Sequence, residues 1–313
     1  MLGFINCNKP TEWSSRDAVN IVQGRLRGKK VKVGHCGTLD PLADGVLVIG
    51  VGSAAKLVPY VHQCGKCYRG RFRLGEESET GDIEVLPTKH ADDPIPTRQQ
   101  VDAACKTFLG AIQQVPPAYS AIKINGQRAY KMARKGQQVE VPPRQVFIQS
   151  LSVIHYEYPN LELEIVCGTG TYIRTLGMDL ARSMSAHAVM TGLQRTRVGD
   201  FLLEQAVTID QIREQPWEEL LQPAALGVSH LPQVTVDADQ HLALVHGKLL
   251  DRIELLAPTS EFQTIPVADQ EGEDQLAAAI DQAGRLVAIL IKKGTRWKVR
   301  KCLVTEIWTG NET

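Results

Sequence analysis

Residues 34–52, GHCGTLDPLADGVLVIGVG, are the most informative stretch of this sequence. Their first part, residues 34–45, is rich in Gly, Asp and Pro, which is the composition of a loop whose backbone turns sharply. Residues 46–51 then form a continuous apolar run, which is typical of a buried strand. We therefore predict a polar loop fixed against a buried strand, an arrangement that can hold a catalytic group.

The residues before this loop predict a helix. Ser14 and Asp17 have the spacing of a capping box, in which each end of the motif bonds the backbone of the other. Apolar residues then recur at helical spacing from Ala18 to Leu26. We expect this helix to span residues 15–27.

The residues after the loop predict both strands and helices. Residues 68–74 alternate strictly, so they predict a half-buried strand whose second face carries three arginines. Residues 146–154 and 161–166 also predict strands, whereas residues 171–184 have helical periodicity. This mixture is typical of the α+β fold class.

The pattern changes near residue 222. Residues 222–232 contain Pro and Gly and predict a linker. Strands are expected near residues 285–291 and 297–304, which together indicate a short β-rich terminal domain.

The composition excludes several classes of protein. Of 313 residues, 43% are hydrophobic and 22% are charged, with 35 basic and 35 acidic side chains, as in globular rather than disordered or fibrous proteins. No apolar run reaches the ~18 residues of a membrane span, and the N-terminus lacks the pattern of a secretory signal. Seven cysteines, an odd number over a long chain, favour reduced thiols. We therefore expect a cytoplasmic protein with one large and one smaller domain.

The net charge of zero conceals a segregation of charge. Residues 1–36, 120–135 and 292–301 are basic, whereas residues 261–281 carry acidic groups and no base. Basic runs interleaved with aromatic residues are typical of a surface that binds a polyanion, because phosphates attract Lys and Arg and bases stack on rings. The aromatic residues concerned are Tyr119, Tyr130 and Trp297. Each run alone is better explained as a solvated face, but the three together favour nucleic acid.

Residues 34–52 resemble the signature loop of the bacterial TruB family of tRNA pseudouridine synthases. In that signature, Gly-His-x-Gly-x-Leu-Asp-Pro-x-Ala-x-Gly-x-Leu surrounds the one catalytic aspartate, which corresponds to Asp40. Further family blocks follow in the family's order, at residues 9–15, 66–69, 114–123, 170–176 and 193–196. The resemblance covers about residues 3–205 and implies a mixed, mainly antiparallel sheet of the pseudouridine synthase type. It also implies a catalytic domain at residues 1–228 and, more weakly, a small PUA-like RNA-binding domain at residues 229–313.

The resemblance implies an isomerase that converts uridine at position 55, in the T-loop of elongator tRNAs, to pseudouridine. The base is everted, its glycosidic bond is cleaved and it is rejoined through carbon, with no cofactor and no metal. Asp40 would supply the one ionised carboxylate, which either attacks C1′ or removes a proton from C2′. The expected partner is the T arm of tRNA, without an obligate protein partner and without a membrane.

The resemblance also implies supporting roles for further residues around the site. Tyr68 would stack on the everted base, Arg174 would pair with Asp40 and keep it ionised, and His35 would occupy space near the extruded nucleotide. Pattern alone favours Tyr68 as an ordinary core aromatic of an alternating strand. The other family positions around the site are Lys9, Lys56, Asp82, Tyr172 and Leu193.

The sequence departs from the family pattern at three places. Asn8 replaces the usual Asp before Lys-Pro, and residues 78–82 read SETGD where the family has Thr-Asp-Thr-x-Asp. Both changes keep hydrogen-bonding capacity. Residues 187–189 read HAV where a Gly-Ala-aromatic-like pattern is expected, which puts substrate contacts there in doubt.

Two other functions remain open from the sequence. A guide-RNA-dependent relative shares the signature, but the insertion before residues 116–119 fits the stand-alone bacterial form. A tRNA-binding or folding chaperone without essential catalysis is disfavoured by the joint presence of Asp40, Tyr68 and Arg174.

Cys64 and Cys67 have the spacing of half a zinc site or of a redox pair. No second Cys-x-x-Cys motif accompanies them. We therefore expect reduced thiols and no metal at this pair.

Overall fold

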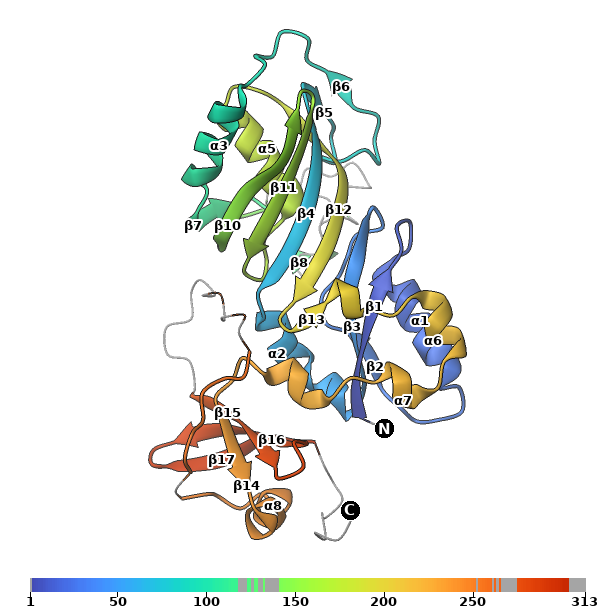
Figure 1. Ribbon diagram of the computed structural model, residues 1–313, viewed down its shortest axis with the longest axis vertical. Coiled ribbons are helices and arrows are strands. Elements are labelled where there is room, and N and C mark those ends of the chain that lie inside the picture. Colours follow the sequence, from blue (N-terminus) through green and yellow to red (C-terminus); the bar gives the residue numbers. More distant parts are fainter. Residues whose placement is uncertain are drawn as a thin grey trace. The chain divides into compact units, whose positions relative to one another are not determined.

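The computed structural model contains two compact units, each of which has its own strands and helices (Figure 1). It describes residues 2–117, 141–251, 253–260 and 275–303, together with positions 123, 124, 127, 128, 132, 262 and 265. The first unit comprises Met1–Cys64, Arg197–Thr264 and Gln270–Thr313, and the second comprises Gly65–Thr196 and Ile265–Asp269. None of the described helices is long and apolar enough to cross a membrane. The predicted boundary between residues 228 and 229 stays a prediction.

The N-terminal part of the first unit has the predicted helix and buried strand. Strand β1 (Leu2–Lys9) pairs antiparallel with β3 (Ala43–Gly52), and β2 (Val33–His35) also pairs with β3. Every residue of β3 from position 45 to position 51 is buried, as the apolar run predicts. Helix α1 (Ser15–Arg25) begins with the predicted capping box and ends two residues earlier than expected. The remaining elements of this part are η1 (Ser53–Leu57), α2 (Val58–Gln63), β13 (Phe201–Leu202), η2 (Leu203–Gln205), α6 (Ile209–Glu214), α7 (Trp217–Leu220) and η3 (Ala224–Val228).

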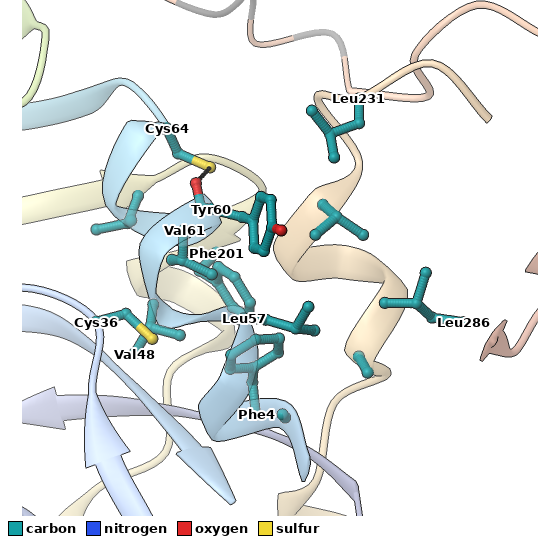
Figure 2. Packing of buried hydrophobic residues seen from close by; sticks show 14 of the residues in the cluster. Phe4, Cys36, Val48, Leu57, Tyr60, Val61, Cys64, Phe201, Leu231 and Leu286 are labelled. Carbon is teal, nitrogen blue, oxygen red and sulfur yellow. Dashed lines mark hydrogen bonds between the residues drawn. The ribbon is translucent and has the colours of Figure 1, made fainter. Parts of the chain in front are cut away.

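One of the two described hydrophobic clusters of the first unit packs around Phe4 and Phe201 (Figure 2). Phe4 and Phe201 contact each other edge to face, with ring centroids 5.4 Å apart. The predicted linker at residues 222–232 is wrong, because η3 buries Ala224 and Val228 in this core. Ala224 and Gly227 lie one 3-10 turn apart, and Val228 follows directly, so this short helix buries one of its faces.

A small four-stranded sheet forms the C-terminal part of the first unit. Its strand order is β14-β15-β16-β17, with the first pair parallel and the other two pairs antiparallel. The two predicted strands are confirmed as β16 and β17, whereas β14, α8 and β15 were not expected. The elements are β14 (Gln233–Val236), α8 (Ala238–Val245), β15 (Leu276–Asp281), β16 (Leu286–Lys293) and β17 (Arg296–Cys302).

The second unit contains the strand order β12-β4-β11-β10-β7, and every pair among β4, β11, β10 and β7 is antiparallel. Helix α3 lies against β10 and α5 against β4 (Figure 1). The α+β prediction with a mainly antiparallel sheet is confirmed. The elements are β4 (Lys66–Leu74), β5 (Glu76–Glu77), β6 (Thr88–Lys89), α3 (Arg98–Thr107), β7 (Gly110–Gln114), β8 (Lys123–Ile124), β9 (Gln127–Arg128), β10 (Arg144–Glu157), β11 (Asn160–Cys167), α5 (Ile173–Ser183) and β12 (Ala188–Val198).

Gly177 lies where α5 packs on β4, and its substitution is expected to reduce stability. A Cβ atom at Gly177 would overlap the buried ring of Phe72. Ala favours the helix by about 1 kcal/mol over Gly, but overpacking a core costs about 1–3 kcal/mol. Gly177→Ala should therefore lower the free energy of unfolding by about 1–2 kcal/mol in urea titrations.

Gly24 in α1 provides a matched control, because no atom lies within 4 Å of the Cβ that Ala would add there. Gly24→Ala should raise the free energy of unfolding by about 0.5–1 kcal/mol. Equal changes in the two variants would contradict the close packing of α5 on β4.

Candidate active site

Asp40 lies at an exposed position of the loop between β2 and β3, and the backbone on either side of it is fixed. The buried hydroxyl of Ser15 donates to the Leu39 carbonyl at 3.0 Å and accepts from the Leu39 N–H at 2.8 Å. On the other side, the N–H of Glu12 donates to the carbonyl of Pro41 at 2.7 Å. The loop therefore holds Asp40 at a defined exposed position, which is what a group that reacts with a bound substrate requires.

Lys9 supports this loop from within the first unit. It is fully buried, and its Nζ atom donates to the carbonyls of Pro10 at 2.8 Å and Trp13 at 2.5 Å. A buried ammonium group requires such partners, because its desolvation is costly. Lys9 thus fixes the turn that contains Glu12, although its predicted place around the substrate stays a prediction.

His35 and Lys56 also lie in the first unit. His35 is half-buried on β2, opposite Ile49 of β3. Lys56 is exposed in η1, and its Nζ atom donates to the carbonyl of Cys302 at 3.1 Å. The predicted roles of His35 and Lys56 in substrate binding stay predictions.

Asp82 and Arg174 form a buried ion pair in the second unit. The Nη1 atom of Arg174 lies 2.6 Å from Oδ2 of Asp82, and their side chains are only 7% and 3% exposed. The same nitrogen donates to the carbonyl of Thr80 at 2.8 Å, and the Thr80 hydroxyl donates to Oδ1 of Asp82 at 2.6 Å. The structure therefore brings together two of the predicted site residues. The predicted pairing of Arg174 with Asp40 would join groups of different units and stays a prediction.

A side-chain amide fixes the start of the helix that carries Arg174. Tyr172 is the N-cap residue of α5, and its N–H donates to the buried Gln114 Oε1 at 2.8 Å. The Gln114 Nε2 in turn donates to the Tyr172 carbonyl at 3.0 Å, and the guanidinium of Arg144 lies 4.7 Å from the centre of the Tyr172 ring. Sequence analysis did not single out Gln114 or Arg144. The signal for Gln114 was its place at the start of the family block at residues 114–123.

Tyr68 and Leu193 are largely buried in the second unit, each with an exposed fraction of 8%. Tyr68 lies on β4 opposite Ile165 of β11, on the apolar face of the alternating strand. Its predicted stacking on a base stays a prediction, as does the place of Leu193 at the site.

The surface charge differs from the sequence prediction in two respects. The alternation of β4 is confirmed, but Arg69 and Arg71 lie directly opposite Glu164 and Glu162 of β11. Opposite charges at facing positions of a sheet attract, so this face has mixed rather than basic charge.

The predicted stacking role of Trp297 is wrong. Trp297 is 5% exposed and packs in the core of the small sheet with Leu244 and Leu290, because it alternates inward on β17. Tyr119, Tyr130 and most of the basic run at residues 120–135 lie outside the described residues. The third basic run is exposed on the β16–β17 hairpin and comprises Lys292, Lys293, Arg296, Lys298, Arg300 and Lys301.

All seven cysteines lie in the described part of the chain, and none of them forms a disulfide. Burial raises the pKa of the Cys7 and Cys167 thiols to about 12. Both thiols therefore stay protonated at neutral pH and are weak metal ligands.

Comparisons with known proteins extend the sequence resemblance to 95% of the chain. The model of the TruB family pseudouridylate synthase N-terminal domain matches residues 25–173. The chain is 39% identical over 327 residues to the tRNA pseudouridine synthase B of Rhodopirellula baltica, covering 95% of this chain and 93% of that protein. It is 37% identical over 254 residues to the tRNA pseudouridine synthase B of Microcystis aeruginosa, and the match covers 80% of this chain and 85% of that protein.

The fold has a counterpart among solved structures. A chain in the crystal structure of a Cbf5-Nop10-Gar1 complex has a TM-score of 0.73 and 24% identity, covering 96% of this chain and 85% of that chain. At that identity the likeness shows the fold alone. The identity to the Rhodopirellula baltica protein over nearly the entire chain shows that this protein belongs to the TruB family of tRNA pseudouridine synthases and is an isomerase.

Proposed function

We propose that the protein converts the uridine at position 55, in the T loop of elongator tRNAs, to pseudouridine, with Asp40 as the catalytic carboxylate. The observation that carries this proposal is the loop around Asp40. Its backbone is held at Leu39 and at Pro41, while Asp40 itself is exposed. The similarity to proteins named tRNA pseudouridine synthase B supports tRNA as the substrate.

The proposed reaction moves one bond of the nucleoside. The target base leaves the RNA stack, because an enzyme cannot reach the sugar of a stacked nucleotide. Asp40 assists the cleavage of the C1′–N1 bond, by attack on C1′ or by removal of the C2′ proton. The detached uracil turns, C5 bonds to C1′, and N1 gains a proton while C5 loses one. The product therefore has the same atoms as the substrate, and no redox step is required.

The proposed roles of the supporting residues come from the family resemblance. Arg174 is proposed to pair with Asp40 and keep its carboxylate ionised. Its guanidinium also binds Asp82 and Thr80. Tyr68 is proposed to stack on the everted base. The exposed basic hairpin β16–β17 is proposed to contact tRNA phosphates as part of a small RNA-binding domain at residues 229–313.

The test is release of tritium from a tRNA transcript labelled at C5 of uridine. Rejoining through C5 must expel that hydrogen, so the protein should release one tritium per tRNA without any added cofactor. A transcript with cytidine at position 55 serves as the control and should give no release. Equal release from both transcripts would contradict the assignment of the target nucleotide, and no release from the first would contradict the proposed activity.

A further inference from the structure

Glu77, His90 and His187 meet in the second unit from three separate segments. Glu77 belongs to β5, His90 follows β6, and His187 precedes β12. The Oε2 atom of Glu77 lies 3.6 Å from Nε2 of His90 and 3.8 Å from Nε2 of His187. One ligand atom from each residue lies within 4.8 Å of the other two. Ligand atoms around a tetrahedral zinc ion are roughly 3.3 Å apart, given bonds of about 2.0–2.1 Å, so the two distances from Glu77 are close to that spacing.

Asp93 fixes the ring of His187 in the orientation that a metal ligand needs. Its Oδ2 atom accepts from the His187 N–H at 2.7 Å, and both of its oxygens lie 3.0 Å from Nδ1 of His187. A carboxylate on Nδ1 selects the tautomer with the proton there, which leaves the Nε2 lone pair for a metal. Nε2 is the nitrogen that faces Glu77. The pair therefore matches the carboxylate–histidine arrangement found behind many metal ions.

The backbone ties the two histidines together through Gly75. The N–H of Gly75 donates to the His187 carbonyl at 3.0 Å, and the N–H of His90 donates to the Gly75 carbonyl at 2.9 Å. Gly75 has a φ of 73°, a conformation that favours glycine. The positions of His90 and His187 are therefore set by main-chain contacts rather than by the side chains alone.

Metal binding requires a turn of the His90 ring and the release of Glu77 by Arg182. The two imidazole rings stack with centroids 3.7 Å apart and 15° between their planes, and a metal ion must lie in the plane of each ring it binds. The His90 side chain is 32% exposed and can turn, whereas Asp93 holds His187. Glu77 also lies 3.6 Å from the exposed Arg182, which has a second partner in Asp179 at 3.3 Å. If Glu77 binds the metal, Arg182 therefore keeps the carboxylate of Asp179 as its partner.

We propose that Glu77, His90 and His187 bind one divalent metal ion of the zinc class, with Asp93 as a positioning residue. Two imidazoles and a carboxylate are donors that suit zinc, and the half-exposed setting leaves a fourth position for water. The family resemblance implies no metal, so this site is additional to the expected activity and does not rest on the proposed function. It also gives a role to His187, at a position where the sequence departs from the family pattern.

The ion would crosslink the start of the loop that carries Asp82 to the segment before β12. That loop leaves β5 after Glu77 and pairs with β12 at Met190, three residues after His187. The N–H of Met190 donates to the carbonyl of Gly81 at 3.0 Å, and the N–H of Ile83 donates to the carbonyl of Met190 at 3.2 Å. A metal bound to Glu77 and His187 would therefore link both strands that support Asp82. The proposed function of the ion is structural.

The test is a calorimetric titration of the metal-free full chain with zinc chloride. We expect one zinc per chain, an affinity at least 100-fold lower in His187→Ala and in Glu77→Gln, and an affinity about 10–100-fold lower in Asp93→Asn. His155→Ala, an exposed histidine on β10, is the matched control and should bind zinc like the unaltered protein. Circular dichroism of each variant shows that it is folded.

The same samples give a second readout in thermal unfolding. Zinc should raise the unfolding temperature of the unaltered protein and of His155→Ala, because a ligand that binds the folded state stabilises it. It should not raise that of folded Glu77→Gln. No binding to the unaltered protein, or binding that persists in His187→Ala and Glu77→Gln but is lost in Cys64→Ser/Cys67→Ser, would overturn the proposal.

Discussion

Asp40→Asn should abolish pseudouridine formation while leaving tRNA binding within a few-fold of the unaltered protein. Asn has nearly the same shape as Asp but can neither attack C1′ as an anion nor accept a proton from C2′. Loss of such a group typically lowers turnover by about 10²–10⁴-fold, and a reaction that depends on one carboxylate should lie at the upper end. Asp40 is exposed, so the free energy of unfolding should change by less than about 0.5 kcal/mol. Tritium release and a filter-binding assay on the same tRNA measure the two effects separately.

Asp44→Asn provides the matched control for this variant. Asp44 lies in the same signature, at a position that the family pattern leaves open, and it is the second, half-buried residue of β3. Its substitution should leave turnover within a few-fold. Turnover that survives in Asp40→Asn, or that falls equally in both variants, would contradict the role of Asp40.

The elements that sequence analysis predicted are those with a local signal. The capping box at Ser14 and the apolar run of β3 were both visible in a few adjacent residues, and both are confirmed. Helices α3, α6 and α8 begin with equivalent capping boxes at Thr97, Thr208 and Asp237, which a fuller use of the same signal would have found. Capping boxes therefore predict the starts of α1, α3, α6 and α8.

Contacts between distant segments could not be predicted in the same way. A family motif predicted that Arg174 belongs to the active site. No sequence pattern predicts its ion pair with Asp82, which lies 92 positions earlier in the chain. Likewise, the arginine-bearing face of β4 has mixed rather than basic charge, because glutamates of β11 lie opposite its arginines. These features depend on strand register and helix packing, which residue patterns do not determine by themselves.

Arg174→Met should strongly destabilise the protein and reduce its turnover. Removal of the guanidinium leaves the Asp82 carboxylate buried without its counterion, and such losses cost about 3–5 kcal/mol. Turnover should fall as well, because the loop from Ser78 to Glu84 is held to α5 through this pair. Urea unfolding measures the first effect and tritium release the second, at a temperature where the variant remains folded.

Arg182→Met on the same helix separates burial from charge. Its side chain is 54% exposed and its ion pairs with Asp179 and Glu77 lie at 3.3 and 3.6 Å, so its loss should cost less than about 1 kcal/mol. The double variant Arg174→Met/Asp82→Asn should be less destabilised than the sum of its single variants, because neither charge is then left buried alone. Strict additivity would show that the pair contributes nothing as a pair. A large loss in Arg182→Met would instead show that helix α5 tolerates no change of charge, and the burial of Arg174 would cease to explain its effect.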